Sequence, residues 1–171
     1  MPIIHPILPV FDEHSRVLIL GSFPSVKSRE AQFFYGHPQN RFWRVLSALF
    51  GEKAGETPAE KTAFLLRHNI ALWDVIASCE IEGSADSSIT DAAPNDLSVI
   101  LCTAQITHIF TNGKTADRLY RRYLQTLTGI EAVCLPSTSP ANAAWTTDRL
   151  IEAWRVVRQA LDEKAISRFN T

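Results

Sequence analysis

The stretch RVLILGSFPS, residues 16–25, decides how this chain folds. Residues 16–20 form a short apolar run that predicts a buried β-strand, and the glycine, serines and proline behind it predict a tight loop. Similar runs predict strands at residues 71–76, 107–111 and 132–135. Amphipathic segments separate the runs, an alternation typical of βα units. We therefore expect an α/β fold, a three-layer α-β-α sandwich with a central, mainly parallel four-stranded sheet.

The helix that begins near Thr57 has the best-marked start in the sequence. Thr57 can cap its N-terminus, Pro58 fits the first helical position and Glu60 stands at the capping-box position. Residues 86–95 are rich in Ser, Asp and Ala, so we expect a loop there. No repeat or linker divides residues 1–171, and we expect a single domain. The apolar spacing predicts further helices over residues 40–50, 95–102, 114–127 and 146–164.

Charge and composition exclude several classes of protein. Lys and Arg number 17 against 18 Asp and Glu, a formal net charge of -1, so any contact with nucleic acid must be local rather than made by a strongly basic surface. No apolar run approaches the roughly 18 residues of a membrane-spanning helix. The N-terminus, MPIIHPILP, lacks the features of a secretory leader. We expect a cytoplasmic monomer with no membrane partner.

The cysteines give no indication of a metal site. Cys79, Cys102 and Cys134 are far apart and form no CxxC pair, which does not suggest a zinc or iron–sulfur centre. We expect buried, reduced thiols, no bound metal and no cofactor. P-loop, dinucleotide-binding and GxSxG motifs are also missing from the sequence, so kinase, dehydrogenase and serine-hydrolase functions have no positive support.

Small polar loops follow three of the four predicted strands. They are residues 21–25, 112–114 and 136–142, rich in Gly, Ser, Pro and Asn. Ligands of open α/β sheets bind beyond the carboxyl ends of the strands, and loops of this composition let backbone amides approach a phosphate or a base. Each loop alone is also explained by ordinary turn geometry. Their shared edge of the sheet indicates a binding site.

The segment FFYGHPQNRFW, residues 33–43, is harder to explain as scaffold. We expect Phe42 and Trp43 to be buried on the following helix. Three adjacent aromatic residues, 33–35, are not expected to face one core, so at least one should be free to stack on a planar group such as an extruded base. Asn40 can be an N-cap or a functional amide. His37 can titrate near neutrality or can hydrogen-bond to the loop backbone.

These motifs together resemble the uracil-DNA glycosylase superfamily. GSFPS is similar to its first motif, HPQNRFW to a segment shared with mismatch-specific uracil and thymine glycosylases, and LPSTSPAN to its DNA-intercalating loop. The resemblance extends from residue 17 to about residue 154. The combination of FYGHPQNRFW, GSADSSI and LPSTSPAN most resembles the hypoxanthine-DNA (deoxyinosine) glycosylase branch.

Two departures from the wider superfamily affect the chemistry that this resemblance implies. Phe23 stands where many members carry Asp or Asn to handle the attacking water, and Leu135 stands where some carry His. The resemblance then assigns catalysis to Asn40. It implies that Tyr35 or Phe34 stacks on the extruded base, that Asn112 contacts the edge of the base, and that the loop with Ser137, Thr138, Ser139, Pro140 and Ala141 enters the minor groove. Phe23 and His37 are further candidates for base contacts, and Ser22, Ser25 and Lys27 are candidates for phosphate contacts.

Hydrolysis of an N-glycosidic bond needs a placed water and an environment that tolerates charge on the sugar and the leaving base. The oxygen of the Asn40 side chain could orient the water while its NH2 contacts the nucleotide, but an amide is no strong base, so we expect modest catalytic power. For Asp74 and Asp86, buried support of neighbouring loops is favoured over a general-base role. Arg118, Arg121 and Arg122 can follow a phosphate backbone or form a solvated helix face, with the latter favoured.

The function expected from this reasoning is a monofunctional, metal-independent DNA glycosylase. It would flip deaminated bases out of DNA and excise them in base excision repair, hypoxanthine in preference to uracil. Its partner would be DNA containing deaminated bases. The alternatives are a G:U mismatch-specific uracil-DNA glycosylase, a lesion-binding module with weak or no catalysis, and a small-molecule hydrolase that uses Ser22 or Ser137.

Overall fold

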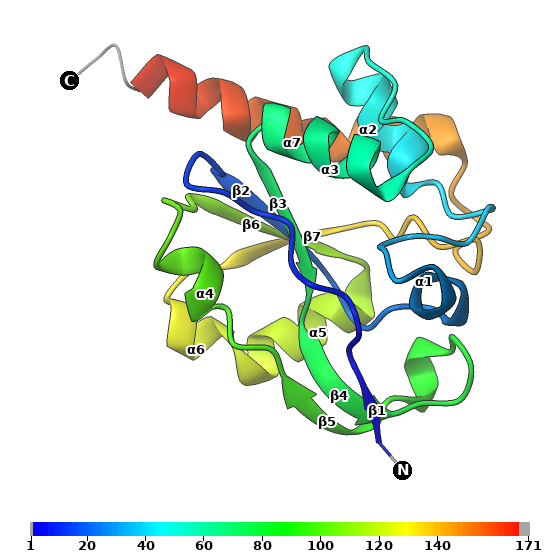
Figure 1. Cartoon of the computed structure of the whole chain (residues 1–171). Helices are drawn as coiled ribbons and strands as arrows, with labels where there is room; N and C mark the ends of the chain where they lie inside the picture. The colour runs from blue at the N-terminus through cyan, green and yellow to red at the C-terminus, as the bar shows by residue number, and fades with distance from the viewer. Residues whose placement is uncertain (1, 168–171) are drawn as a thin grey trace.

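Four parallel strands form the centre of the computed structural model, which describes residues 2–167. Their order across the sheet is β3-β2-β6-β7 (Figure 1). Every neighbouring pair is parallel, which brings all four carboxyl ends to one edge. The strands are β2 (Val17–Gly21), β3 (Ile70–Asp74), β6 (His108–Asn112) and β7 (Ala132–Leu135). The predicted four-stranded parallel sheet is confirmed.

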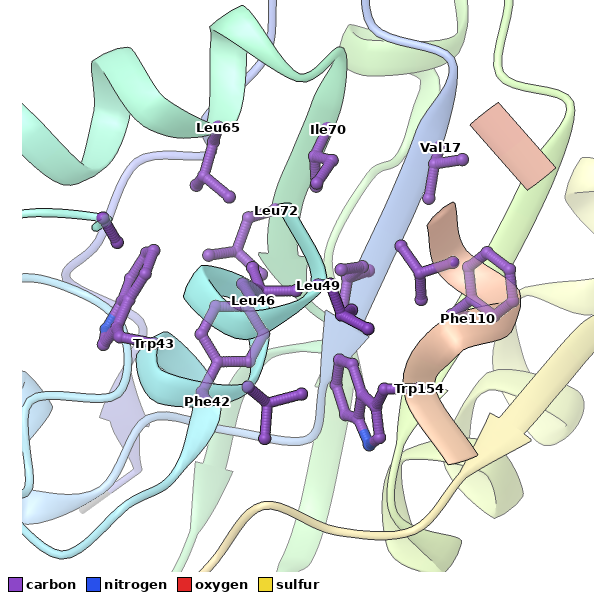
Figure 2. Close-up of a cluster of buried hydrophobic side chains, with 14 of the residues drawn as sticks. Val17, Phe42, Trp43, Leu46, Leu49, Leu65, Ile70, Leu72, Phe110 and Trp154 are labelled. Carbon is purple, nitrogen blue, oxygen red and sulfur yellow. The ribbon is translucent and has the colours of Figure 1, made fainter. Parts of the chain in front are cut away.

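Helices cover both faces of this sheet, as a three-layer sandwich requires (Figure 1). One core lies beneath α2, α3 and α7, where Phe42, Leu65 and Trp154 meet the sheet (Figure 2). The second core lies on the other face, where Ile100 of α4 and Tyr120 of α5 are fully buried. The helices are α1 (Val26–Ala31), α2 (Phe42–Phe50), α3 (Pro58–Arg67), α4 (Ser98–Leu101), α5 (Lys114–Tyr123), α6 (Gln125–Thr128) and α7 (Thr147–Ser167).

A second, antiparallel sheet was not expected from the sequence. It consists of β1 (Ile3–Ile4), β4 (Ile76–Glu80) and β5 (Thr90–Pro94) in the order β1-β4-β5. The loop predicted at residues 86–95 is therefore wrong: a short 3₁₀ helix, η1 (Asp86–Ser88), precedes β5. Most of β5 is exposed and its register with β4 is irregular, so its sequence lacks the apolar alternation by which strands are recognised.

The predicted strand at residues 71–76 is divided between the two sheets. β3 ends at Asp74 and β4 begins at Ile76, with Val75 between them. The Val75 amide donates to the Gly21 carbonyl at 2.8 Å, which holds the chain where it passes from one sheet to the other. The apolar run continues through this bend because both strands are buried there. Hydrophobic periodicity alone therefore does not reveal the bend.

Each predicted helical segment contains a helix, but the helices begin or end at other residues than predicted. Thr57 caps α3 as expected, accepting from the Glu60 amide at 3.1 Å. The single helix predicted at residues 114–127 is interrupted at the buried Leu124, whose φ of -122° is not helical. α4 is shorter than predicted, because the Asn95 side chain donates to the carbonyls of Asp74 and Ile76 and holds that residue outside the helix.

The expectation of three buried thiols is wrong for two of them. Cys79 is buried, but Cys102 and Cys134 are exposed, and all three are free. The sequence did not reveal the exposure of these two residues, because cysteine is a mostly buried residue type and this tendency does not decide a single position. In the part of the chain that the structure describes, no His, Cys, Asp or Glu side chains gather in threes to hold a metal ion, and no helix is long and apolar enough to cross a membrane.

Trp154→Ala should lower the free energy of unfolding by about 3–5 kcal/mol, because it empties the centre of the core under α7. Trp154 is fully buried, packs edge-on against Phe42 and donates to the Pro136 carbonyl at 2.9 Å. Urea denaturation measures the change. Val156→Ala, at an exposed position of the same helix, is the control and should change stability by less than about 0.5 kcal/mol. Equal effects of the two substitutions would contradict this account of the core.

Candidate active site

A cavity of about 140 Å³ opens at the carboxyl edge of the parallel sheet. The loops after β2 and β7 line it together with the segment before α2. The predicted site residues that line the cavity are Asn40, Phe23, Phe34, Tyr35, His37, Asn112, Ser22, Ser25, Ser137, Thr138, Ser139 and Pro140. The remaining lining residues are Gly21, Pro24, Ser28, Asp74, Ser84 and Asp86.

Two residues predicted to contact DNA do not line the cavity. Lys27 is exposed on α1, where its ammonium group lies 3.7 Å from the Glu30 carboxylate. Ala141 is exposed in the loop after β7, and its amide donates to the Ser139 hydroxyl at 3.1 Å. Both lie in segments adjoining the cavity, so a role for them would be in the surrounding surface.

A hydrogen-bond relay joins the three polar segments of the site. The Thr138 amide donates to Asn112 Oδ1 at 3.0 Å, which requires an oxygen there and turns Asn112 Nδ2 toward the Thr138 hydroxyl, also at 3.0 Å. Since Thr138 Oγ1 accepts from Asn112, its own proton goes to Asn40 Oδ1 at 2.8 Å. The Phe42 amide donates to the same Oδ1 at 3.0 Å. The backbone thus fixes the orientation of both amide side chains.

These hydrogen bonds leave only the NH2 group of the Asn40 side chain free to act. Its Oδ1 already accepts two hydrogen bonds, the usual capacity of a carbonyl oxygen. Its Nδ2 makes no hydrogen bond with another described residue. As Asn40 lines the cavity, the amide presents a donor to whatever enters. The capping role considered from the sequence is also present in part: the helix begins at Phe42 with Arg41 at the cap position, and Asn40 supplies the side-chain oxygen.

A buried His5–Asp74 pair lies at the closed end of the cavity. His5 Nε2 lies 2.7 Å from Asp74 Oδ2, and the two side chains are 3% and 4% exposed. The Ile7 amide donates to His5 Nδ1 at 3.1 Å, so Nδ1 carries no proton and the neutral ring donates through Nε2. Asp74 Oδ1 makes no hydrogen bond within the described chain. Asp74 therefore supports the fold through one oxygen and offers an acceptor through the other.

Tyr35 lies beside this acceptor in a left-handed backbone conformation, with φ of 52°. Its ring stacks on Phe42 at 4.0 Å. Burial raises the pKa of the hydroxyl far above its usual range, and the Asp74 charge raises it further, so the group stays protonated. The Asn112 amide is close enough to oppose that shift, but no hydrogen bond of acceptable geometry to a described residue reaches the hydroxyl.

Gly21 makes room for both groups. A Cβ at this position would lie 2.3 Å from Asp74 Oδ1 and 2.9 Å from the Tyr35 hydroxyl, closer than real Cβ contacts. The glycine at the end of β2 was expected to serve close approach of a ligand. In the structure it serves the close approach of two side chains that face the cavity.

The aromatic triplet packs differently from the expectation. Phe34 is 2% exposed inside the core under α2, and Phe33 and Tyr35 pack against the same core. The prediction that three adjacent aromatics cannot face one core is wrong, because the left-handed conformations of Gln32 and Tyr35 turn the backbone between them. Phe34 still lines the cavity, so its position is compatible with a base contact.

Asp86 is the second carboxylate in the lining. Its Oδ1 accepts from the Ser22 hydroxyl at 2.8 Å, which connects the GSADSSI segment to the loop after β2. The residue is exposed overall, but its carboxyl group faces the cavity. Desolvation there raises its pKa, and the Asp74 charge acts in the same direction, against the hydrogen bond from Ser22 and the charge of Arg118.

His37 stands at the opening of the cavity and shows the structural role considered for it. The Gln39 amide donates to His37 Nδ1 at 3.1 Å, and the Asn40 amide donates to the His37 carbonyl at 3.0 Å. The ring thereby shapes the HPQN turn. Its position in the lining leaves Nε2 available to a ligand.

Arg41 fastens the loop after β7 to the start of α2. Its guanidinium donates to the carbonyls of Ser139 at 3.0 Å, Asn142 at 3.1 Å and Trp145. Its amide donates to the Thr138 carbonyl at 3.1 Å. Arginine suits this position because its fixed fork of donors can serve several carbonyls at once.

Comparison with known proteins identifies the family of the chain. The family model of the Uracil DNA glycosylase superfamily matches residues 8–158 of the chain. The chain belongs to this superfamily.

Individual members of the superfamily are similar over most of their length. A protein of Methanosarcina acetivorans named hypoxanthine DNA glycosylase is 39% identical over 150 residues, which covers 86% of this chain and 93% of that protein. A Methanosarcina barkeri protein of the same name is 36% identical over 136 residues, covering 78% and 85%. The solution NMR structure of a Methanosarcina acetivorans protein described as a uracil DNA glycosylase superposes with a TM-score of 0.79 at 35% identity, covering 95% and 99%.

Within this superfamily fold, the two departures noted in the sequence are apolar positions. Phe23 is 7% exposed and packs edge-on against His5 at 5.8 Å. Leu135 is 3% exposed at the end of β7. Among the residues that line the cavity, the carboxylates come instead from Asp74 and Asp86.

Sequence reasoning missed several residues that build the site. Nothing in MPIIHPILP indicates that His5 reaches a strand end 69 positions away. Arg41 is adjacent to Asn40 and could have been noticed, but three carbonyl acceptors in a distant loop leave no trace in the sequence. Ser28 and Ser84 also escaped attention: the Ser28 hydroxyl accepts from the Gly36 amide at 3.0 Å, and that of Ser84 from the Val26 amide at 2.9 Å.

Arg41→Lys should loosen the loop after β7, because a single ammonium group cannot serve the three carbonyls. Losing one hydrogen bond to a charged group, worth about 1.5 kcal/mol, corresponds to at least about tenfold faster amide exchange at Asn142 and Trp145. Hydrogen–deuterium exchange measures this. Arg44→Lys, an exposed neighbour with only a 3.5 Å contact to the Gln39 carbonyl, is the control. Equal exchange in both variants would show that Arg41 does not hold the loop.

Proposed function

We propose that this protein is a monofunctional DNA glycosylase that hydrolyses the N-glycosidic bond of hypoxanthine flipped out of DNA. The observation that carries the proposal is the cavity that unites Asn40, Asn112 and Asp74 at the carboxyl edge of the sheet. The names of the two Methanosarcina relatives support hypoxanthine as the base. The formal net charge of -1 fits a partner held by local contacts, and we expect the protein to act as a monomer.

The cavity fits a base that has left the stack. A target base must be extruded before a protein can reach its glycosidic bond, and it then needs a closed pocket with apolar walls and few polar groups. Phe23 and Phe34 supply apolar surface, while Asn112 and Asp74 supply polar contacts. Ser137, Ser139 and Pro140 belong to the loop after β7, which we propose contacts the DNA, while Thr138 of the same loop is buried and holds Asn40.

Asp74 gives a chemical reason for selecting deaminated bases. Its Oδ1 is an acceptor in a buried position, since the neutral His5 occupies Oδ2. Hypoxanthine carries an N–H at ring position 1 beside a carbonyl, and uracil has the same pairing of N–H and carbonyl. Adenine has a lone pair at that ring nitrogen, which a carboxylate repels. A buried acceptor left without a donor is costly, so adenine is rejected by the site itself.

Asn40 is the proposed catalytic amide, acting as a hydrogen-bond donor. With Oδ1 held by Thr138 and Phe42, the NH2 group is the part that meets the nucleotide. A fixed donor directed at the leaving base stabilises the negative charge that develops when the glycosidic bond breaks. The relay from Asn112 keeps this donor in place before the substrate arrives.

Asn40→Ala should lower the single-turnover rate of hypoxanthine release by about 10²–10³-fold, the usual cost of removing one donor to a developing anion. The measurement is alkaline cleavage of abasic sites in a duplex with hypoxanthine opposite thymine. Gln39→Ala removes a neighbouring, exposed amide side chain outside the cavity and should keep the wild-type rate.

Wild-type protein that binds this duplex but leaves no abasic sites would replace the proposed enzyme with a lesion-binding module. The same assay with uracil opposite guanine tests the mismatch-specific alternative. Faster release of uracil than of hypoxanthine would contradict the proposed base preference.

Asp74→Asn should reverse the hydrogen-bond polarity at the closed end of the cavity. The His5 N–H requires an oxygen, so the new amide must turn its NH2 toward the space that Oδ1 occupies. Release of hypoxanthine should fall by about 10–100-fold, the cost of losing a hydrogen bond to a charged group. Release of the unsubstituted purine of 2′-deoxynebularine, which has a lone pair at ring position 1, should fall less. An unchanged ratio of the two rates would show that Asp74 does not contact the base edge.

A further inference from the structure

Because of the orientation of Asn40, its side chain cannot activate the water that the proposed reaction requires. Hydrolysis needs an acceptor that binds the attacking water and receives its proton. Asn40 Oδ1 does not have a free lone pair for this, because Thr138 Oγ1 and the Phe42 amide both donate to it. Its polarity is set by backbone N–H groups and is therefore not reversible by a simple amide flip.

Two carboxylates line the cavity, and their depths differ. The Asp74 side chain is 4% exposed and lies against His5 at the closed end. The sugar of a flipped nucleotide stays attached to the DNA backbone, so its C1′ atom remains near the opening while the base goes inward. Asp74 therefore faces the base. Asp86 belongs to an exposed segment, lines the cavity, and accepts through its carboxyl group from Ser22, another lining residue.

We propose that Asp86 is a second catalytic residue, whose carboxylate binds the attacking water and takes its proton while Ser22 holds the carboxylate in place. This inference rests on the proposed glycosylase function. The Ser22 hydroxyl donates to Asp86 Oδ1 at 2.8 Å, which leaves Oδ2 for the water. Ser22 is 8% exposed and lies next to Phe23 in the loop after β2. The lining residues of that loop include no carboxylate, and Asp86 brings one to it from a separate segment.

The step balances without any further reactant. The bond between C1′ and the base nitrogen breaks, and its electron pair leaves with the base, next to the Asn40 donor. The water oxygen forms a bond to C1′, and one water proton passes to the Asp86 carboxylate and then to solvent. The released base takes up a proton from solvent. With Asp86 in this role, its anionic carboxylate faces the sugar, where positive charge develops, and stabilises that charge.

The electrostatic surroundings of Asp86 suit a base. Desolvation raises the pKa of its carboxyl group, and a carboxylate with a raised pKa accepts a proton more readily. The hydrogen bond from Ser22 and the charge of Arg118 limit that rise and favour the ionised form. The charges of Asp74 of β3 and Arg118 of α5 act on this carboxylate. Its own charge in turn raises the pKa of Cys79 of β4 and of Tyr35.

Asp86→Asn tests the proposal because its amide oxygen can still accept from Ser22, so the loop should keep its position. We expect single-turnover release of hypoxanthine to fall by about 10²–10³-fold, as for loss of a general base, with duplex affinity and the thermal midpoint close to wild type. Asp91→Asn, an exposed carboxylate in β5 outside the cavity lining, is the matched control and should keep the wild-type rate.

A pH profile separates catalysis from support. The wild-type rate should fall as the pH drops through the pKa of Asp86, because protonation removes the acceptor, and Asp86→Asn should lose this contribution to the acid limb. A rate within threefold of wild type, or an acid limb with the same position and depth as in wild type, would overturn the proposal. Wild-type protein without hypoxanthine release would instead refute the proposed function, and so the two failures are distinguishable.

Discussion

Two backbone N–H groups, those of Thr138 and Phe42, set the chemistry of this site. Each requires an oxygen, so together they dictate which way the amides of Asn112 and Asn40 point. The Thr138 hydroxyl then transmits the choice from one amide to the other. Both groups are placed by regular structure, since Phe42 begins α2 and Thr138 follows β7. A rigid scaffold thereby decides the polarity of the proposed catalytic side chain before any ligand binds.

The parallel sheet makes this arrangement available. Because β2, β3, β6 and β7 all end at one edge, residues from four distant parts of the chain meet around one cavity. The edge is apolar where Phe23 and Phe34 lie and polar where Asp74 and Asn112 end their strands. The cavity therefore combines apolar walls with a small set of oriented hydrogen-bonding groups, which suits the proposed planar base.

The sequence predicts the central sheet and most of the site loops for a physical reason. Strands buried on both faces are continuous apolar runs, and loops at their carboxyl ends carry small polar residues whatever the ligand. What it does not predict depends on distant packing. β5 has no apolar face to recognise, and the bend at Val75 lies within a continuous apolar run. The donor role of Asn40 depends on its hydrogen bond with Thr138, a residue 98 positions away, which no local pattern encodes.

His5 connects the cavity to a short peripheral strand through its contact with Asp74. His5 follows β1, a strand of two residues that pairs with β4 alone, and the ring then reaches Asp74. Short peripheral strands open by local fluctuation at lower free energy than the core. The contact between His5 and Asp74 can thus open while both hydrophobic cores remain folded. A change in the dynamics of the N-terminal segment would then move the Asp74 carboxylate that lines the cavity without altering the global stability of the protein.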